Sequence, residues 1–203
     1  MKKRILLGAG FILVSLVLAA CAGGLISKET AVVMKPAAQP AAKIVSLPKA
    51  TMIAVGDMNL ARRVDWLMRT YGMDYPLKEV KGRLQQADAT FGNLECAVSN
   101  RGAPLPGKGI WLRAKPEVMT ELKECGFDIL SVANNHSLDY DTEAFLDTLK
   151  YLDQAGIIPV GGGTDIIDAQ KGRIMEVNGL KIGFLAYTEM ADMVWSFQHP
   201  RKL

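Results

Sequence analysis

The chain has 203 residues, which is enough for one domain with a buried core and too few for two large ones. Its formal charge is +3, but Lys2, Lys3 and Arg4 supply this excess, since no acidic residue precedes Glu29. Without residues 1–20 the chain has 21 basic and 21 acidic residues, so its net charge is 3 − 3 = 0. This balance leaves no basic excess that would indicate a nucleic acid partner.

Residues 1–21 have the three parts of a bacterial export signal. A basic start is followed by an uncharged run of 16 residues from Ile5 to Ala20. That run is shorter than the roughly 20 residues of a membrane-spanning helix and is typical of a signal peptide. Leu18-Ala-Ala-Cys21 resembles a lipobox, in which the cysteine thiol is acylated. We therefore expect an exported protein that is anchored to membrane lipid through Cys21, in the inner or the outer membrane.

Two alternatives to this lipoprotein signal stay open. The segment is also compatible with an ordinary secretory signal that happens to end near a cysteine, and with a short uncleaved anchor.

Residues 22–50, rich in Ala and Pro, are predicted to form a tether, because they offer little apolar surface to bury. Cys96 and Cys125 lack the spacing of a zinc site and are interpreted as buried free thiols.

From Thr51 onward, short apolar runs alternate with segments of helical pattern. Strands are expected at 51–55, 89–92, 127–132 and 157–160, and helices at 62–71, 77–86, 116–125 and 142–154. Two further strands, 172–177 and 181–187, flank Asn178-Gly179, which is a strong hairpin signal. This order predicts an α/β domain with a mainly parallel sheet and a late antiparallel pair.

Three of the predicted strands end in polar residues that are able to bind metal. The three segments are Val55-Gly-Asp57, Gly92-Asn-Leu-Glu95 and Ala133-Asn-Asn-His136. Each one alone is compatible with a turn or a helix cap. Together, on neighbouring parallel strands, they would meet at one edge of the sheet, where Mn²⁺, Zn²⁺ or Fe ions find suitable ligands. A carboxylate from Asp57 or Glu95 could bridge two such ions.

The same residues resemble a known family. In order along the chain, Gly56-Asp57, Asn93-Leu-Glu95 and Ser131-Val-Ala-Asn-Asn-His-Ser-Leu-Asp139 resemble the CapA family, associated with capsule and poly-γ-glutamate synthesis. Further likeness lies in Trp111–Glu117, Glu124–Asp128 and Gly156–Gly163, so that the resemblance covers about residues 50–190. The family is similar to the calcineurin-like metallophosphatases, whose fold is a sheet sandwich flanked by helices.

The resemblance implies roles for individual residues. It implies that Asp57, Glu95 and Asn135 bind one or two divalent ions and that His136 acts near the scissile group of a phosphoester or anionic polymer. Arg113 could hold an anionic substrate through its planar guanidinium group, or it could be a surface or structural arginine.

Asp139 could orient His136, but a cap on the following helix is the slightly favoured interpretation. Asp141 departs from the resemblance, because the family usually has glycine there. The later histidine motifs of the family have no match, since His199 does not fit them. Residues 51–203 are therefore expected to form only the N-terminal part of a metallophosphatase-like domain.

The resulting hypothesis is a membrane-anchored CapA-like protein of capsule or poly-γ-glutamate synthesis with a metallophosphoesterase-type site. Whether the chain is an enzyme stays open at this point. A non-catalytic tethered partner of a polymer synthase and an inactive truncated fragment are the alternatives.

Overall fold

The structure is a computed structural model that describes residues 47–190. The predicted signal peptide, Cys21 and nearly all of the predicted tether therefore lie outside the described residues. The elements in chain order are β1 (Met52–Met58), α1 (Arg63–Tyr71), α2 (Lys78–Leu84), β2 (Ala89–Leu94), β3 (Ala97–Val98), β4 (Arg113–Ala114), α3 (Val118–Glu124), β5 (Ile129–Ser131), α4 (Asp141–Gln154), β6 (Ile158–Val160), α5 (Ile166–Ala169), β7 (Arg173–Val177) and β8 (Leu180–Phe184).

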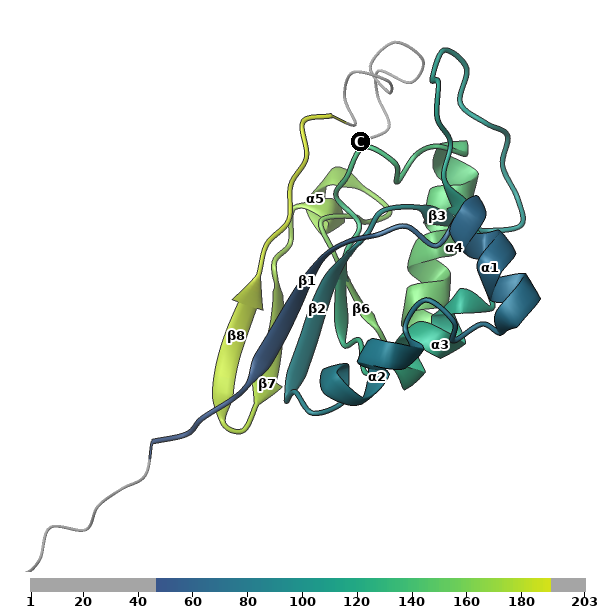
Figure 1. The fold of residues 1–203 in the computed structure, drawn as a ribbon. Helices are drawn as coiled ribbons and strands as arrows, with labels where there is room; N and C mark the ends of the chain where they lie inside the picture. The colour runs from purple at the N-terminus through teal and green to yellow at the C-terminus, as the bar shows by residue number, and fades with distance from the viewer. Residues whose placement is uncertain (1–46, 191–203) are drawn as a thin grey trace, which may run out of the picture. The chain divides into compact units, whose positions relative to one another are not determined.

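Four parallel strands form the central sheet in the order β1-β2-β5-β6. Each successive strand of this sheet is therefore added on the same side of the strand before it. Right-handed connections between parallel strands then place the intervening helices on one face of the sheet. Figure 1 shows α1 to α4 on one side of the sheet and the β7-β8 hairpin on the other. The predicted α/β class, with a parallel sheet flanked by helices, is confirmed.

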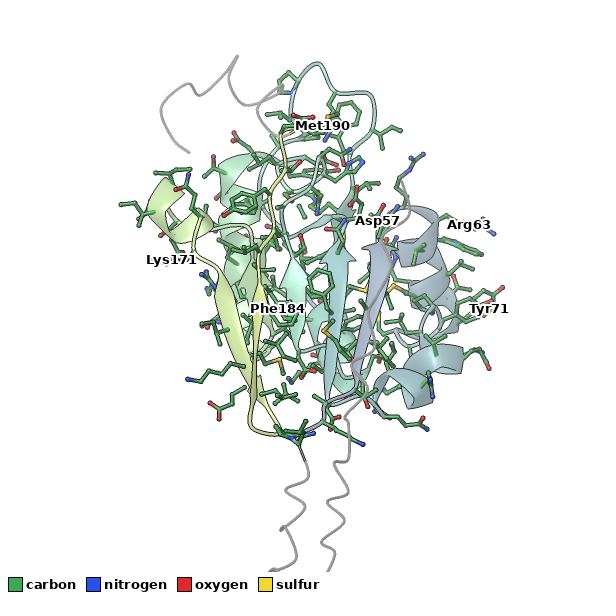
Figure 2. All side chains as sticks on the ribbon, turned by 90° about the vertical axis from the view of Figure 1, so that its left-hand side faces the viewer. Asp57, Arg63, Tyr71, Lys171, Phe184 and Met190 are labelled. Atoms are coloured by element: carbon green, nitrogen blue, oxygen red, sulfur yellow. The ribbon has the colours of Figure 1, made fainter. Side chains whose placement is uncertain are left out.

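Alternate residues of the strands build two separate cores. On the helical face, Leu130 belongs to a large buried cluster that includes Leu122 of α3 and Leu152 of α4. On the opposite face, Ile129 and Val160 pack with Phe184 of the hairpin. The rings of Phe91 and Phe184 stack with their centroids 5.8 Å apart, and Figure 2 shows Phe184 between the hairpin and the sheet.

The predicted hairpin is confirmed, with its turn at Asn178-Gly179. Both turn residues have positive φ, 50° and 80°, as a two-residue turn that matches strand twist requires. β7 and β8 pair antiparallel from Arg173 opposite Phe184 to Val177 opposite Leu180. The side-chain amide of Asn178 also donates a hydrogen bond of 3.1 Å to the carbonyl of Lys49, just before β1.

The structure differs from the predicted elements mainly near the strand ends. β1 continues to Met58 and β2 to Leu94, so Asp57 and Asn93 are strand residues and not loop residues. The two-residue parallel pair β3-β4 and the four-residue helix α5 are too short to produce a periodic pattern in the sequence. Asp141, where the resembling family has glycine, has a φ of 66°, a left-handed conformation that aspartate tolerates better than most residues.

Two further findings concern the cysteines and membrane spans. Cys96 and Cys125 are both buried and unpaired, as predicted. Within residues 47–190, none of the helices combines the length and the hydrophobicity needed to cross a membrane.

Candidate functional site

A bulge in β1 sets the position of Asp57. Ala54 pairs with Phe91 but Asp57 pairs with Asn93, so β1 has one more residue than β2 over this stretch. Such a bulge bends the strand and changes the direction of the side chains that follow it. The Asn93 side-chain amide donates a 2.9 Å hydrogen bond to Oδ1 of Asp57. Figure 2 shows Asp57 at the carboxyl end of the sheet.

Asn93 joins Asp57 to a second carboxylate. The same Nδ2 atom of Asn93 that bonds Asp57 also donates to Oε2 of Glu95. Burial raises the pKa of Glu95, and the nearby charge of Asp57 raises it further. The two carboxylates therefore lie close enough to repel each other, and a cation bound between them would relieve this repulsion.

Asn134 ties the histidine-bearing segment to β2. Its Nδ2 atom donates to Oδ1 of Asn93 at 3.0 Å and to the carbonyl of Leu94 at 2.9 Å. Its Oδ1 atom accepts from the backbone N–H of His136 and from the hydroxyl of Ser137, each at 3.0 Å. Asn134 is buried, and all of its hydrogen bonds hold the site together, so its role here is structural.

Asp139 holds the imidazole ring of His136. The Nδ1 atom of His136 lies 2.8 Å from Oδ2 of Asp139, whose side chain is fully buried. That carboxylate also accepts the backbone N–H of Leu112 at 2.5 Å. The prediction that Asp139 caps the following helix is wrong, because α4 has Tyr140 at its N-cap position and no side-chain cap. Asp139 instead orients His136.

Lys108 is a member of this network that the sequence did not reveal. Its ammonium group binds Oδ1 of Asp139 and the backbone carbonyl of Asn135. It lies in the Gly- and Pro-rich segment 102–109, whose pattern indicates only a loop. Because Lys108 neutralises the buried carboxylate of Asp139, it makes the burial of that charge tolerable.

The donor set fits a hard divalent cation, in part. Asp57 and Glu95 could supply carboxylate oxygens, and the side-chain amide of Asn135 makes no hydrogen bond with any described residue. Oxygen donors of this kind favour Mn²⁺ over softer ions. The part of the chain that the structure describes contains no group of three or more His, Cys, Asp or Glu side chains able to hold an ion. Water or further groups would have to complete the coordination.

Arg113 lies apart from these carboxylates, in β4. Its guanidinium carbon is 3.9 Å from the centre of the Tyr140 ring. Its Nη1 atom donates to the carbonyls of Arg101 and Gly102, at 3.0 and 3.2 Å. Arg113 lines a pocket of about 220 Å³ whose lining includes neither Asp57, Glu95 nor His136.

The fold and the strand-end cluster define the class of the protein. A parallel sheet flanked by helices, with Asp, Asn, Glu and His at its carboxyl edge, is consistent with the N-terminal part of a metallophosphatase-like domain. Residues 51–202 match the family described as bacterial capsule synthesis protein PGA_cap, and the chain belongs to this family. The resemblance to CapA is thereby confirmed.

Individual relatives agree with this assignment. The chain is 34% identical over 144 residues to the capsule biosynthesis protein CapA of Bacillus anthracis, covering 70% of this chain and 35% of the relative. It is 30% identical over 139 residues to the PGA biosynthesis protein CapA of Bacillus subtilis, covering 68% and 37%. A probable polyglutamine synthesis accessory protein of Mycobacterium tuberculosis is 28% identical over 127 residues, covering 61% and 33%. The chain thus spans about a third of the length of these relatives.

Proposed function

We propose that this protein acts in the synthesis of a bacterial capsule or of poly-γ-glutamate, and that Asp57 and Glu95 form part of a metallophosphoesterase-type site. Membership of the capsule synthesis family supports the first part. The second part rests on one observation, the amide of Asn93 that bonds both carboxylates at the carboxyl edge of the sheet.

In the proposed site, different residues would bind the metal ion and transfer the proton. A divalent cation, when bound, supplies positive charge that polarises a phosphoryl oxygen. Asp57, Glu95 and Asn135 would hold it. Asp139 accepts from Nδ1–H of His136, so in the neutral ring Nε2 has a lone pair that could accept a proton. With both ring nitrogens protonated, Nε2–H would give its proton to the leaving oxygen or stabilise the charge there.

The site is proposed to work at the cell surface. The lipobox-like Leu18-Ala-Ala-Cys21 supports export and attachment to membrane lipid through Cys21. The tether of residues 22–50 would then hold the domain at a distance from the bilayer. A Cys21→Ser variant that still incorporates labelled palmitate would contradict the anchor.

A second candidate function is that of a non-catalytic, membrane-tethered partner of a polymer synthase. The printed name of one relative, a probable polyglutamine synthesis accessory protein of Mycobacterium tuberculosis, supports this candidate. In that case Asp57 and Glu95 would bind a cation for structural reasons, and His136 would have no part in chemistry.

Hydrolysis of bis-p-nitrophenyl phosphate by the full chain with added Mn²⁺ separates the two candidates. The phosphoesterase proposal expects metal-dependent turnover that falls by roughly 10²-fold or more in His136→Gln. Asp57→Asn should abolish it, and Asp153→Asn, an exposed change in α4, should leave it unaltered. Metal binding without turnover would favour the non-catalytic partner, and the absence of both would contradict the proposed site.

A further inference from the structure

The pocket beside β4 is separate from the carboxylate cluster and has a composition of its own. Its volume is about 220 Å³, and Asp65, Asn100, Arg113, Lys115 and Tyr140 contribute to its lining. This is smaller than the roughly 300–1,000 Å³ of sites that take drug-sized ligands. The pocket therefore suits one small polar unit and not an extended apolar ligand.

The side chain of Arg113 is fixed by its contacts and keeps hydrogen-bond donors that an anion could accept. Its Nη1 atom donates to two backbone carbonyls, and its guanidinium carbon lies over the Tyr140 ring. The Nε and Nη2 atoms make no hydrogen bond with any residue between 47 and 190. A fixed guanidinium with two remaining donors matches the paired oxygens of a carboxylate, and little side-chain entropy is left to lose on binding.

The charge of the pocket suits a monoanion. Lys115 has no ion-pair partner within the described part of the chain, so its ammonium group adds to the charge of Arg113. Asp65 is the acid in the lining, and it is paired with Arg69. Two cations and one acid leave a balance of 2 − 1 = +1 in the lining. The oxygens of Asp65 and Asn100 can in addition accept an N–H group of the same ligand.

The pocket also adjoins the segments that position His136. Leu112 donates its backbone N–H to Asp139, and Arg113 follows it directly. Tyr140, against which Arg113 stacks, follows Asp139. A ligand held by Arg113 would therefore lie next to Tyr140, which directly follows the His136–Asp139 pair in the chain.

We propose that this pocket binds one unit of an anionic amide-linked polymer, with Arg113 and Lys115 on the carboxylate and Asp65 or Asn100 on the amide N–H. The glutamyl identity of that unit rests on the proposed function, whereas the carboxylate preference rests on the pocket alone. The pocket would bind this unit independently of any metal bound by Asp57 and Glu95, because its lining includes neither carboxylate.

Fluorescence anisotropy with a short labelled γ-glutamate oligomer tests this, using the full chain at constant ionic strength. We expect Arg113→Gln to weaken binding about tenfold or more, since a charge-assisted paired hydrogen bond is lost. Lys115→Gln should weaken it by up to about fivefold, as expected for an exposed charge. Lys181→Gln, which removes an equivalent exposed charge from β8, should change it less than twofold, and near-ultraviolet circular dichroism should confirm that each variant is folded.

Several results would overturn the proposal. One is the absence of oligomer binding by the unaltered chain, and another is equal weakening by Lys115→Gln and Lys181→Gln, which would indicate non-specific charge attraction. Displacement of the oligomer by inorganic phosphate at lower concentration than by glutamate would contradict the carboxylate preference. An Asp57→Asn, Glu95→Gln double variant should keep full oligomer affinity. If the unaltered chain binds oligomer but no metal, the proposed phosphoesterase site fails and the pocket assignment stands.

Discussion

The Nδ1 atom of His136 lies 2.8 Å from Oδ2 of Asp139, in a place where the carboxylate has no exposed surface. A carboxylate only accepts hydrogen bonds, so in the neutral imidazole the proton must be on Nδ1 and the lone pair on Nε2. The Lys108 ammonium group and the Leu112 backbone N–H also donate to the carboxylate of Asp139. The histidine is thus fixed in one tautomer by a residue three positions along the chain.

The tautomer of His136 is the first prediction. The chain has two histidines, so ¹⁵N–¹H correlation spectra should show one ring with a protonated Nδ1. A His199→Gln variant identifies which signals belong to His136. In Asp139→Asn the Nδ1–H population should fall, because a neutral amide holds it less strongly. A His136 ring with its proton mainly on Nε2 in the unaltered chain would contradict the orienting role of Asp139.

The ion pair between Arg101 and the buried carboxylate of Asp147 in α4 gives a prediction about acid stability. Arg101 binds both oxygens of Asp147, and Ser99 donates to the same carboxylate at 2.6 Å. The Arg101 guanidinium lowers the pKa of Asp147 below its ordinary value. The contribution of this ion pair to the stability of the folded protein is therefore fully present above the ordinary aspartate pKa. It is lost as the pH falls through the lowered pKa of Asp147 in the folded protein.

Urea unfolding measures this effect. At pH 7, Asp147→Asn should lower the free energy of unfolding by about 1–3 kcal/mol, because a charge-assisted pair is lost. The gap between this variant and the unaltered chain should close in strongly acidic solution. Asp153→Asn, on the same helix and exposed, is the matched control with an expected change within about 0.5 kcal/mol. A gap that persists unchanged at low pH would argue against the ion pair as its cause.

The small core under the hairpin gives a prediction about packing. Phe184 is one of three fully packed members of that cluster, with Ile129 and Val160. Phe184→Ala should cost about 3–5 kcal/mol of unfolding free energy, and Phe184→Leu under about 1.5 kcal/mol. Leu185→Ala, at a side chain that is 69% exposed, should change little. Equal effects of Phe184→Ala and Leu185→Ala would mean that the hairpin does not pack on the sheet as described.

The cysteines give a prediction about reactivity. Burial raises the pKa of both the Cys96 and the Cys125 thiols to about 12. Neither thiol should therefore form thiolate at neutral pH or meet a reagent in solution. In a Cys21→Ser chain, Ellman's reagent should react slowly with both thiols in the folded protein and rapidly in denaturant. Fast reaction of either thiol under native conditions would contradict the burial.

Most of the fold could be predicted from the sequence because its elements are marked locally. Apolar runs bounded by polar residues mark the parallel strands, and Asn178-Gly179 marks the hairpin turn. Element ends were less predictable. Asp57 and Asn93 look like loop residues by polarity, yet pairing with a neighbouring strand keeps both in extended backbone.

Among the residues of the candidate site, those at or just after strand ends could be predicted from the sequence. These residues are Asp57, Glu95 and His136. The bridging role of Asn93 depends on the bulge that brings Asp57 opposite to it, and no local pattern predicts that shift in register. Lys108 reaches Asp139 across 31 residues through a loop whose path depends on tertiary packing. Local residue patterns do not encode such long-range contacts.

The most direct test of the central claim is equilibrium dialysis of the full chain against Mn²⁺, alongside Asp57→Asn, Glu95→Gln and Asp153→Asn. Removing either site carboxylate should lower affinity by roughly 10-fold or more, since each supplies a charged ligand. Asp153→Asn should bind as the unaltered chain does. Equal Mn²⁺ binding by all four proteins, or none by any, would contradict a metal site at Asp57 and Glu95.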